Sequence, residues 1–327
     1  MKANGTAVPQ MRGPTRKTME RINALKTFLS VDEPISKRAA LYRLLSMGLI
    51  DSTKDFHNVN RALNRALEQG IVTDEHFDDA CFDDNRRLVE TPTTWADPTE
   101  LKETIQSMVL NYRRDLWQDQ PRRVEVWLEK HTVAYLVRDI TDKYGVTLRI
   151  SSGNYSRTFL WRAARDLSGI GITVPLGILY IGDFDPSGLD IERAARRGSN
   201  GRDGIADFLE KDFNWEPGRF EKQVSWLRVG VTEGDYWSMP TKARVPLKDD
   251  EAAKAGTGKD KKKRGDPRAE EFKTKYGDYG VETEALEVLE RNGLARRLER
   301  EIKSRIDNDT WNKSERQQER DRKLLAA

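Results

Sequence analysis

The sequence has 327 residues, of which 37% are hydrophobic and 34% are charged, and its formal net charge is only +3. This composition is typical of a water-soluble chain with room for two domains, and it excludes a wholly disordered or membrane-embedded protein. No apolar run is as long as a bilayer span and no signal-peptide core is found, so we expect a cytoplasmic protein without a membrane partner. Cys81 is the only cysteine and the three histidines are scattered, which excludes an intrachain disulfide and a Cys/His zinc site.

The N-terminal quarter is predicted to be helical and to bind DNA. Residues 1–17 are rich in Gly, Pro, Lys and Arg and predict a flexible basic arm, which three helices follow, beginning near residues 18, 36 and 57. A short strand at 71–77 completes the outline of a winged helix-turn-helix domain over 18–82. Its third helix is then the recognition helix, with four candidate DNA-contacting side chains: Asn60, Arg61, Asn64 and Arg65. The alternative is an ordinary helical bundle with a solvated polar face, because this outline is common.

A polar linker is expected at 83–97, and Pro98 then opens a helix that reaches Arg114, so that linker and connecting helix fill 83–122. The apolar residues of that helix recur at helical spacing, which predicts that they belong to a core. They are Leu101, Ile105, Met108, Val109 and Tyr112.

Strands and helices alternate between residues 123 and 240. Short apolar runs at 124–128, 146–151, 175–181 and 224–231 read as strands, and helical patterns separate them. This alternation predicts a Rossmann-like parallel sheet. The expected fold class is therefore α+β and multidomain, with the winged helix-turn-helix domain followed by an α/β domain.

Three acidic residues follow the predicted strands directly. Glu129 comes after the first strand, and Asp183 and Asp185 come after the third, in the stretch ILYIGDFDPSG. The carboxyl edge of an open α/β sheet is where ligands bind, and neighbouring carboxylates repel each other unless a cation separates them. Oxygen ligands without His or Cys favour Mg²⁺. The alternative is that the aspartates cap the next helix.

The C-terminal third shows little apolar pattern at first. Residues 241–276 predict a charged, mobile loop whose KDKKKR run can contact phosphates, although such a run is more often a solvated face. A helical segment is expected over 277–310, broken near Asn292–Gly293, followed by a frayed tail over 311–327.

The acidic motifs resemble the Toprim domain of topoisomerases, primases and some nucleases. A strand ending in Glu129–Lys130 and a later strand ending in Asp183-x-Asp185 form the signature of that domain. Further motifs of this sequence resemble those of one branch of the family, the A subunit of topoisomerase VI and the related meiotic double-strand-break protein. These are GNYSRTFL ahead of the acids, DFDPSGLDI at the acids, and a weaker echo in VETEAL. The chain is short for such an A subunit, and we expect a stand-alone bacterial or phage-borne relative.

The resemblance implies a DNA-cleaving transesterase. Arg38 and Tyr42 fall on the family's Arg-x-x-aromatic-Tyr pattern, with Leu41 in place of the usual aromatic residue. Tyr42 would be the nucleophile, Arg38 its neighbouring cation, and Glu129 a metal ligand or proton shuttle. Lys130 would contact DNA, and Mg²⁺ would be held by Glu129, Asp183 and Asp185. The implied partners are double-stranded DNA in the nucleoid, a second copy of the chain and a separate ATPase B-type subunit. In the implied homodimer, the tyrosine of one chain acts together with the acids of the other.

Two other functions remain open from the residues alone. A hydrolytic nuclease would use the same acids to activate water, with Tyr42 as a core residue. A non-catalytic DNA-binding accessory protein would keep the metal site for structure only.

Overall fold

The computed structural model describes residues 15–29, 35, 37–68, 70–72, 93–151, 153–169, 174–198, 203–247 and 267–326. Most of the predicted basic arm, wing and linker, and the whole KDKKKR run, lie outside these residues, and α1 (Arg16–Phe28) begins within the predicted arm. The described residues form an α+β structure around a four-stranded parallel sheet, as predicted. None of the described helices has the length and apolar character needed to cross a bilayer.

The sheet has the order β2-β1-β3-β4, and all three pairings are parallel. Its strands match the four predicted runs and are β1 (Arg123–Leu128), β2 (Thr147–Ile150), β3 (Leu176–Ile181) and β4 (Val224–Arg228). Every residue of β3 is buried, because this central strand is covered on both faces. The sequence LGILYI, with no charged residue, suits that position.

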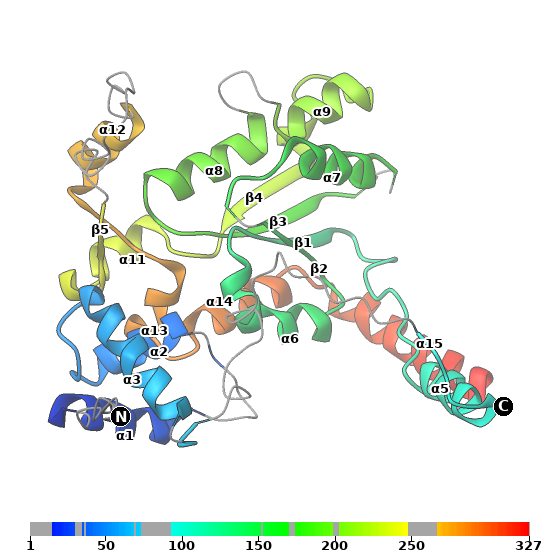
Figure 1. Ribbon diagram of the computed structural model, residues 1–327. Coiled ribbons are helices and arrows are strands. Elements are labelled where there is room, and N and C mark those ends of the chain that lie inside the picture. The colour runs from blue at the N-terminus through cyan, green and yellow to red at the C-terminus, as the bar shows by residue number, and fades with distance from the viewer. Residues whose placement is uncertain are drawn as a thin grey trace, which may run out of the picture.

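Helices cover both faces of the sheet (Figure 1). On one face lie α7 (Arg157–Gly169), α8 (Pro186–Arg197), α9 (Ile205–Asp212) and α10 (Arg219–Gln223). On the other lie η3 (His131–Val133), α6 (Tyr135–Lys143) and α14 (Gly293–Lys303). The alternation of β3 explains the two layers: Ile178 and Tyr180 enter the first core, and Leu179 and Ile181 enter the second.

Three N-terminal helices share the hydrophobic core of the second face rather than standing apart. They are α1 (Arg16–Phe28), α2 (Lys37–Ser46) and α3 (Phe56–Glu68), with the short η1 (Thr53–Asp55) before α3. Their buried side chains form one continuous hydrophobic core with those of α6, α14 and the underside of the sheet. The helix α2 contacts η6 (Thr283–Ala285) and α13 (Leu286–Leu289). The N-terminal helices therefore have a fixed place beside the carboxyl edge of the sheet.

The C-terminal third is more ordered than predicted. Between β4 and η6 the chain forms α11 (Glu233–Ser238), η4 (Thr241–Ala243), β5 (Val245–Pro246), α12 (Pro267–Tyr276) and β6 (Tyr279–Gly280). The prediction of a loop through residue 276 was wrong for α12, whose Phe272 is buried among the rings of Phe184, Tyr236 and Tyr276. The predicted break near Asn292–Gly293 is confirmed: α13 and α14 are separated there, and Asn292 has a φ of +54°.

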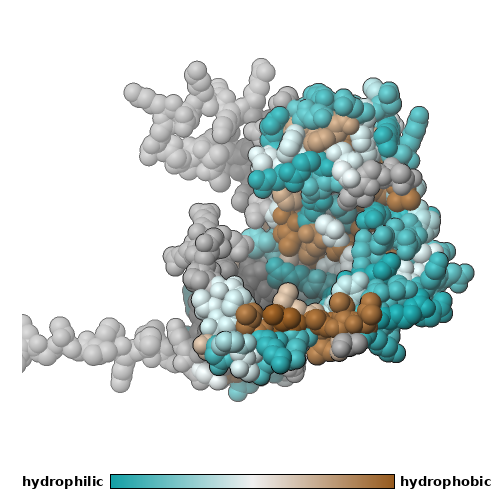
Figure 2. All heavy atoms as spheres, turned by 90° about the vertical axis from the view of Figure 1, so that its right-hand side faces the viewer, coloured by the Kyte–Doolittle hydropathy of each residue, from teal (hydrophilic) through white to brown (hydrophobic). Residues whose placement is uncertain are grey.

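Two helices form an arm that projects from the body (Figure 1): α5 (Pro98–Leu110) and α15 (Asn308–Ala326). The predicted frayed tail is thus a helix, tied to the chain after α5 by an ion pair between Asp321 and Arg114 at 3.3 Å. The prediction that the apolar side of α5 is core was also wrong, because none of its residues is buried. Figure 2 views this side and shows a band of hydrophobic residues along it. Helical spacing reports amphipathicity but not which partner, if any, covers the apolar side.

Candidate functional site

The register of the sheet brings the first two predicted acids together. Leu128 pairs with Ile181, so Glu129 and Gly182 are neighbours at the carboxyl edge. The backbone amide of Asp183 donates a hydrogen bond of 3.2 Å to Oε2 of Glu129. A Cβ at Gly182 would lie 2.5 Å from that oxygen and 2.7 Å from the Tyr180 ring, so a larger residue there would displace these side chains.

Glu129 is almost fully buried, with 5% of its surface exposed. The Tyr180 hydroxyl donates a second hydrogen bond to Oε2, at 3.3 Å. Burial, followed by the negative charges of Asp183 and Asp185, raises the pKa of Glu129 to about 7. Near neutral pH this carboxyl group therefore takes up or releases a proton readily, which is what a proton shuttle requires.

Asp183 is held on both oxygens. Its Oδ1 accepts hydrogen bonds from the backbone amide and the hydroxyl of Thr283, at 2.9 and 3.0 Å, and its Oδ2 forms an ion pair with Nζ of Lys130. Burial alone lowers the pKa of Lys130, but the charges of Glu284, Asp183 and Glu282 outweigh burial and raise it. Lys130 is thus a permanent cation inside the acidic site.

Asp185 begins the helix α8. Its Oδ1 accepts a hydrogen bond of 2.7 Å from the amide of Gly188, and Pro186 occupies the first turn. Burial is the main reason why the pKa of Asp185 is raised, with a further contribution from Asp183. The capping alternative is therefore correct for Asp185. The same residue also belongs to the acidic site, so the two roles do not exclude each other.

The segment 281–284 completes the site, although in the sequence it appeared only as a weak echo of a family motif. Val281 and Phe184 exchange backbone hydrogen bonds of 2.8 and 3.0 Å, which aligns this segment with the loop that carries the aspartates. Glu284 is 2% exposed, its Oε2 has no hydrogen-bond partner, and burial raises its pKa to about 7. The sequence predicted a helical segment over 277–310, whereas the structure ends β6 at Gly280 and begins η6 at Thr283, so local pattern did not place these residues at the acidic edge.

Tyr42 and Arg38 reach the site through the remaining residue of that segment, Glu282. The Tyr42 hydroxyl donates a hydrogen bond of 3.0 Å to Oε2 of Glu282, and Nη2 of Arg38 lies 2.8 Å from Oε1. Nζ of Lys130 lies 4.0 Å from Oε1 of the same carboxylate. The two N-terminal candidates and the acidic edge of one chain are therefore joined within a single network of charges.

The Tyr42 side chain is fully buried in this arrangement, with 0% exposure. Burial, followed by the charges of Glu282 and Glu284, raises its pKa well above the ordinary value for tyrosine. The hydroxyl is accordingly protonated and shielded from solvent.

Arg228, which no motif indicated, holds the loop of the aspartates from behind. Its Nη1 donates to the carbonyl oxygens of Gly182, Asp183 and Val231, at 3.0, 3.0 and 2.9 Å. Its Nε donates to Glu192 at 2.8 Å. The arginine thereby fixes the backbone on which Asp183 stands.

The donor chemistry of the edge fits a hard divalent cation, since Glu129, Asp183 and Asp185 offer only carboxylate oxygens. The orphaned Oε2 of Glu284 adds a further buried negative group. In the part of the chain that the structure describes, however, no three acidic, His or Cys side chains are already grouped as metal ligands. Lys130 occupies Oδ2 of Asp183, and it has to move before a metal binds there.

Four of the predicted DNA-contacting residues lie on α3, and the fifth, Lys130, lies at the acidic edge. The opposite face of α3 is buried and contacts α1 and α2; its buried residues are Val59, Ala62, Leu63 and Ala66. Arg61 is exposed and one guanidinium nitrogen lies 3.0 Å from Nε2 of His57. Asn60 and Arg65 are half-buried, and the side chain of Asn64 lies outside the described residues. The start of α3 meets the site, because the Arg38 guanidinium stacks on the ring of Phe56 at 4.6 Å.

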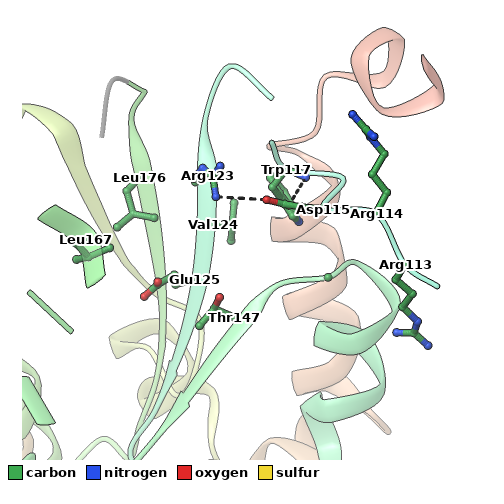
Figure 3. Close-up of a pocket in the computed structure, with 11 residues that line it drawn as sticks. Arg113, Arg114, Asp115, Trp117, Arg123, Val124, Glu125, Thr147, Leu167 and Leu176 are labelled. Atoms are coloured by element: carbon green, nitrogen blue, oxygen red, sulfur yellow. Dashed lines mark hydrogen bonds and ion pairs between the residues drawn. The ribbon is translucent and has the colours of Figure 1, made fainter. Parts of the chain in front are cut away.

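A cavity of about 340 Å³ opens at the opposite, amino edge of the sheet (Figure 3). Arg123 pairs there with Asp115 at 3.7 Å, while Arg113 and Arg114 extend away from both Arg123 and Glu125. Its basic groups do not converge on one point. The acidic edge is therefore the better candidate for chemistry.

Comparisons of the sequence with known proteins give no further assignment: no family model matches the chain, and no curated protein is found to be similar to it.

Proposed function

We propose that the protein binds duplex DNA and breaks it by Mg²⁺-dependent tyrosyl transesterification, as a Toprim protein similar to the A subunit of topoisomerase VI. The observation that carries the proposal is the connection of Tyr42 and Arg38 to the acidic edge through Glu282 and Lys130. The Tyr42 hydroxyl thus shares one carboxylate with Arg38 and lies within the charge network of Lys130, which supports a role for it at the acidic edge.

In this reaction the Tyr42 oxygen attacks the phosphorus of a DNA phosphodiester. A tyrosyl–phosphate bond forms, the bond from phosphorus to the 3′ oxygen breaks, and the proton lost by Tyr42 ends on that oxygen. The bond energy is conserved, so the break can be resealed. Glu129, Asp183 and Asp185 would hold Mg²⁺, which neutralises phosphate charge when bound. Arg38 and Lys130 supply positive charge beside the hydroxyl, and Glu129 exchanges protons near neutral pH.

One observation favours the hydrolytic nuclease as second candidate. Tyr42 is fully buried, so it reaches a phosphate only after α2 separates from Glu282, whereas a water molecule activated at the acidic edge needs no such movement.

Cleavage of supercoiled plasmid with Mg²⁺, with and without protease before electrophoresis, tests the proposal. Transesterification leaves protein covalently attached to the ends, so nicked or linear DNA enters the gel normally only after protease treatment. Free ends without protease would assign the nuclease, and no Mg²⁺-dependent cleavage under any condition would contradict both enzymes.

A further inference from the structure

We infer that Glu282 is a substrate-released latch: it holds the Tyr42 hydroxyl and Arg38 of the same chain out of reach until a DNA phosphate takes the cations away from it. This inference rests on the proposed function and concerns how the same site is regulated.

The position of Glu282 is fixed on both sides by the acidic loop. The residue before it, Val281, exchanges backbone hydrogen bonds with Phe184, and the residue after it, Thr283, donates twice to Asp183. The carboxylate therefore moves with the acidic edge and not with the N-terminal helices. Tyr42 and Arg38, by contrast, both stand on α2, one helical turn apart. The Glu282 contacts therefore tie α2 to the acids, in addition to the packing of α2 on η6 and α13.

The latched hydroxyl is unreactive for two independent reasons. Tyr42 has no exposed surface, so a phosphate cannot approach its oxygen. Two carboxylates face the hydroxyl: Glu282, the N-cap residue of η6, and Glu284, which lies within η6. Their negative charges oppose formation of the Tyr42 phenolate, and the positive charge of Arg38 compensates only in part. A tyrosine that must attack DNA is thus withheld while no DNA is bound.

The partners of Glu282 also indicate what opens the latch. The side chains of Arg38 and Lys130 are 33% and 31% exposed, so both cations can be reached from solvent, whereas the Glu282 side chain is 13% exposed. Guanidinium and ammonium groups bind phosphate well, and duplex DNA presents a row of phosphates. A phosphodiester that pairs with Arg38 and Lys130 removes both cations from Glu282. The uncompensated carboxylate and the displaced Arg38 then favour separation of α2.

The test uses the full chain with 3-fluorotyrosine at position 42, whose fluorine resonance reports both ionisation and solvent exposure. In the free protein we expect no ionisation below the pH at which the chain unfolds. Addition of a short duplex should shift the resonance toward its exposed position, and Glu282→Ala and Glu282→Gln should produce that shift without DNA. With natural Tyr42, both variants should form covalent adduct faster, by roughly tenfold if the latch contributes about 1.4 kcal/mol.

Glu287→Ala is the matched control, because Glu287 pairs with Arg43 across the same α2–α13 contact at 3.7 Å and does not touch Tyr42. An equal effect of this control would show that general loosening, and not the Glu282 contact, exposes Tyr42. Slower adduct formation in both Glu282 variants would overturn the latch and make Glu282 a group that the reaction needs. If no variant cleaves DNA, the proposed function fails, but the fluorine response to duplex and to Glu282→Gln still decides whether the latch exists.

Discussion

The amide of Asp183 donates a hydrogen bond to the Glu129 carboxylate across 3.2 Å, although 54 residues separate them in the chain. Two acids that repel each other are thus locked together by the backbone of adjacent parallel strands. The repulsion between the two carboxylates destabilises the folded protein, and only a bound proton or cation relieves it. The stability of the protein therefore depends on pH.

Stability should fall as pH rises through neutrality. The folded-state pKa of Glu129 is about 7 against an ordinary value of 4.5, so between these values the folded state binds more protons than the unfolded state, and the free energy of unfolding decreases with pH. The shift corresponds to roughly 3 kcal/mol, fully felt only above pH 7. Glu129→Gln should therefore stabilise the protein at pH 8 and have little effect at pH 4.5, as measured by urea unfolding.

Mg²⁺ should act in the same direction as protonation. At pH 8 we expect the melting temperature of the parent protein to rise with Mg²⁺ concentration, because a bound cation relieves the repulsion between the acids. The gain should disappear in Asp183→Asn with Asp185→Asn, since asparagine keeps the α8 cap but not the charge. If the melting temperature of the parent protein does not change with Mg²⁺ concentration, the predicted metal site is wrong.

Tyr42→Phe should abolish the covalent adduct while the protein stays folded. Only the hydrogen bond to Glu282 is lost, about 1 kcal/mol or slightly more, because Glu282 keeps Arg38 as a partner. Adduct formation on plasmid and thermal unfolding measure the two effects. If the variant cuts DNA like its parent, the hydrolytic nuclease takes the place of the transesterase.

The same variant tests whether Tyr42 acts on the acids of its own chain or of a second copy. The described contacts place it beside its own acids, whereas the family resemblance implies a homodimer that exchanges them. Mixing Tyr42→Phe chains with Asp183→Ala, Asp185→Ala chains should restore nicking if catalysis occurs between chains. Continued inactivity of the mixture, with each variant folded, would indicate that tyrosine and acids act within one chain.

DNA affinity should depend steeply on salt and weakly on sequence, because arginine contacts to phosphate dominate. Arg61→Ala with Arg65→Ala on α3 should weaken binding and reduce the slope of log K against log salt by about 2. Arg316→Ala, an exposed arginine on the projecting α15, is the control and should leave both unchanged. Fluorescence anisotropy at several salt concentrations provides the measurement, and equal effects of the two changes would remove α3 from the interface.

Arg228→Lys should damage the acidic loop without touching an acid. A lysine retains the positive charge, but its single ammonium group cannot both reach the three carbonyl oxygens that Nη1 contacts and donate to Glu192 as Nε does. We expect a loss of roughly 1–3 kcal/mol of stability, together with weaker Mg²⁺ stabilisation. Unchanged Mg²⁺ response at reduced stability would limit Arg228 to a general structural role.

The sequence by itself determined the sheet and its acidic edge. Short branched apolar runs specify buried parallel strands, and parallel strands must bring their carboxyl ends to one edge, so the sequence alone groups Glu129, Asp183 and Asp185. The break at Asn292 could also be predicted from local sequence, because Asn292 adopts a left-handed backbone conformation directly before a glycine.

Only the tertiary structure decided what surrounds those acids and which faces stay exposed. Glu282 contacts Tyr42 although 240 positions separate them in the sequence. This contact depends on how α2 packs beside the sheet, and the periodicity of a single element does not predict such packing. The apolar side of α5 carried the signature of a core helix yet remained uncovered, since burial depends on a partner surface as well as on the helix itself. The physical reason is the same in both cases: periodicity fixes the face of an element, whereas packing fixes its neighbour.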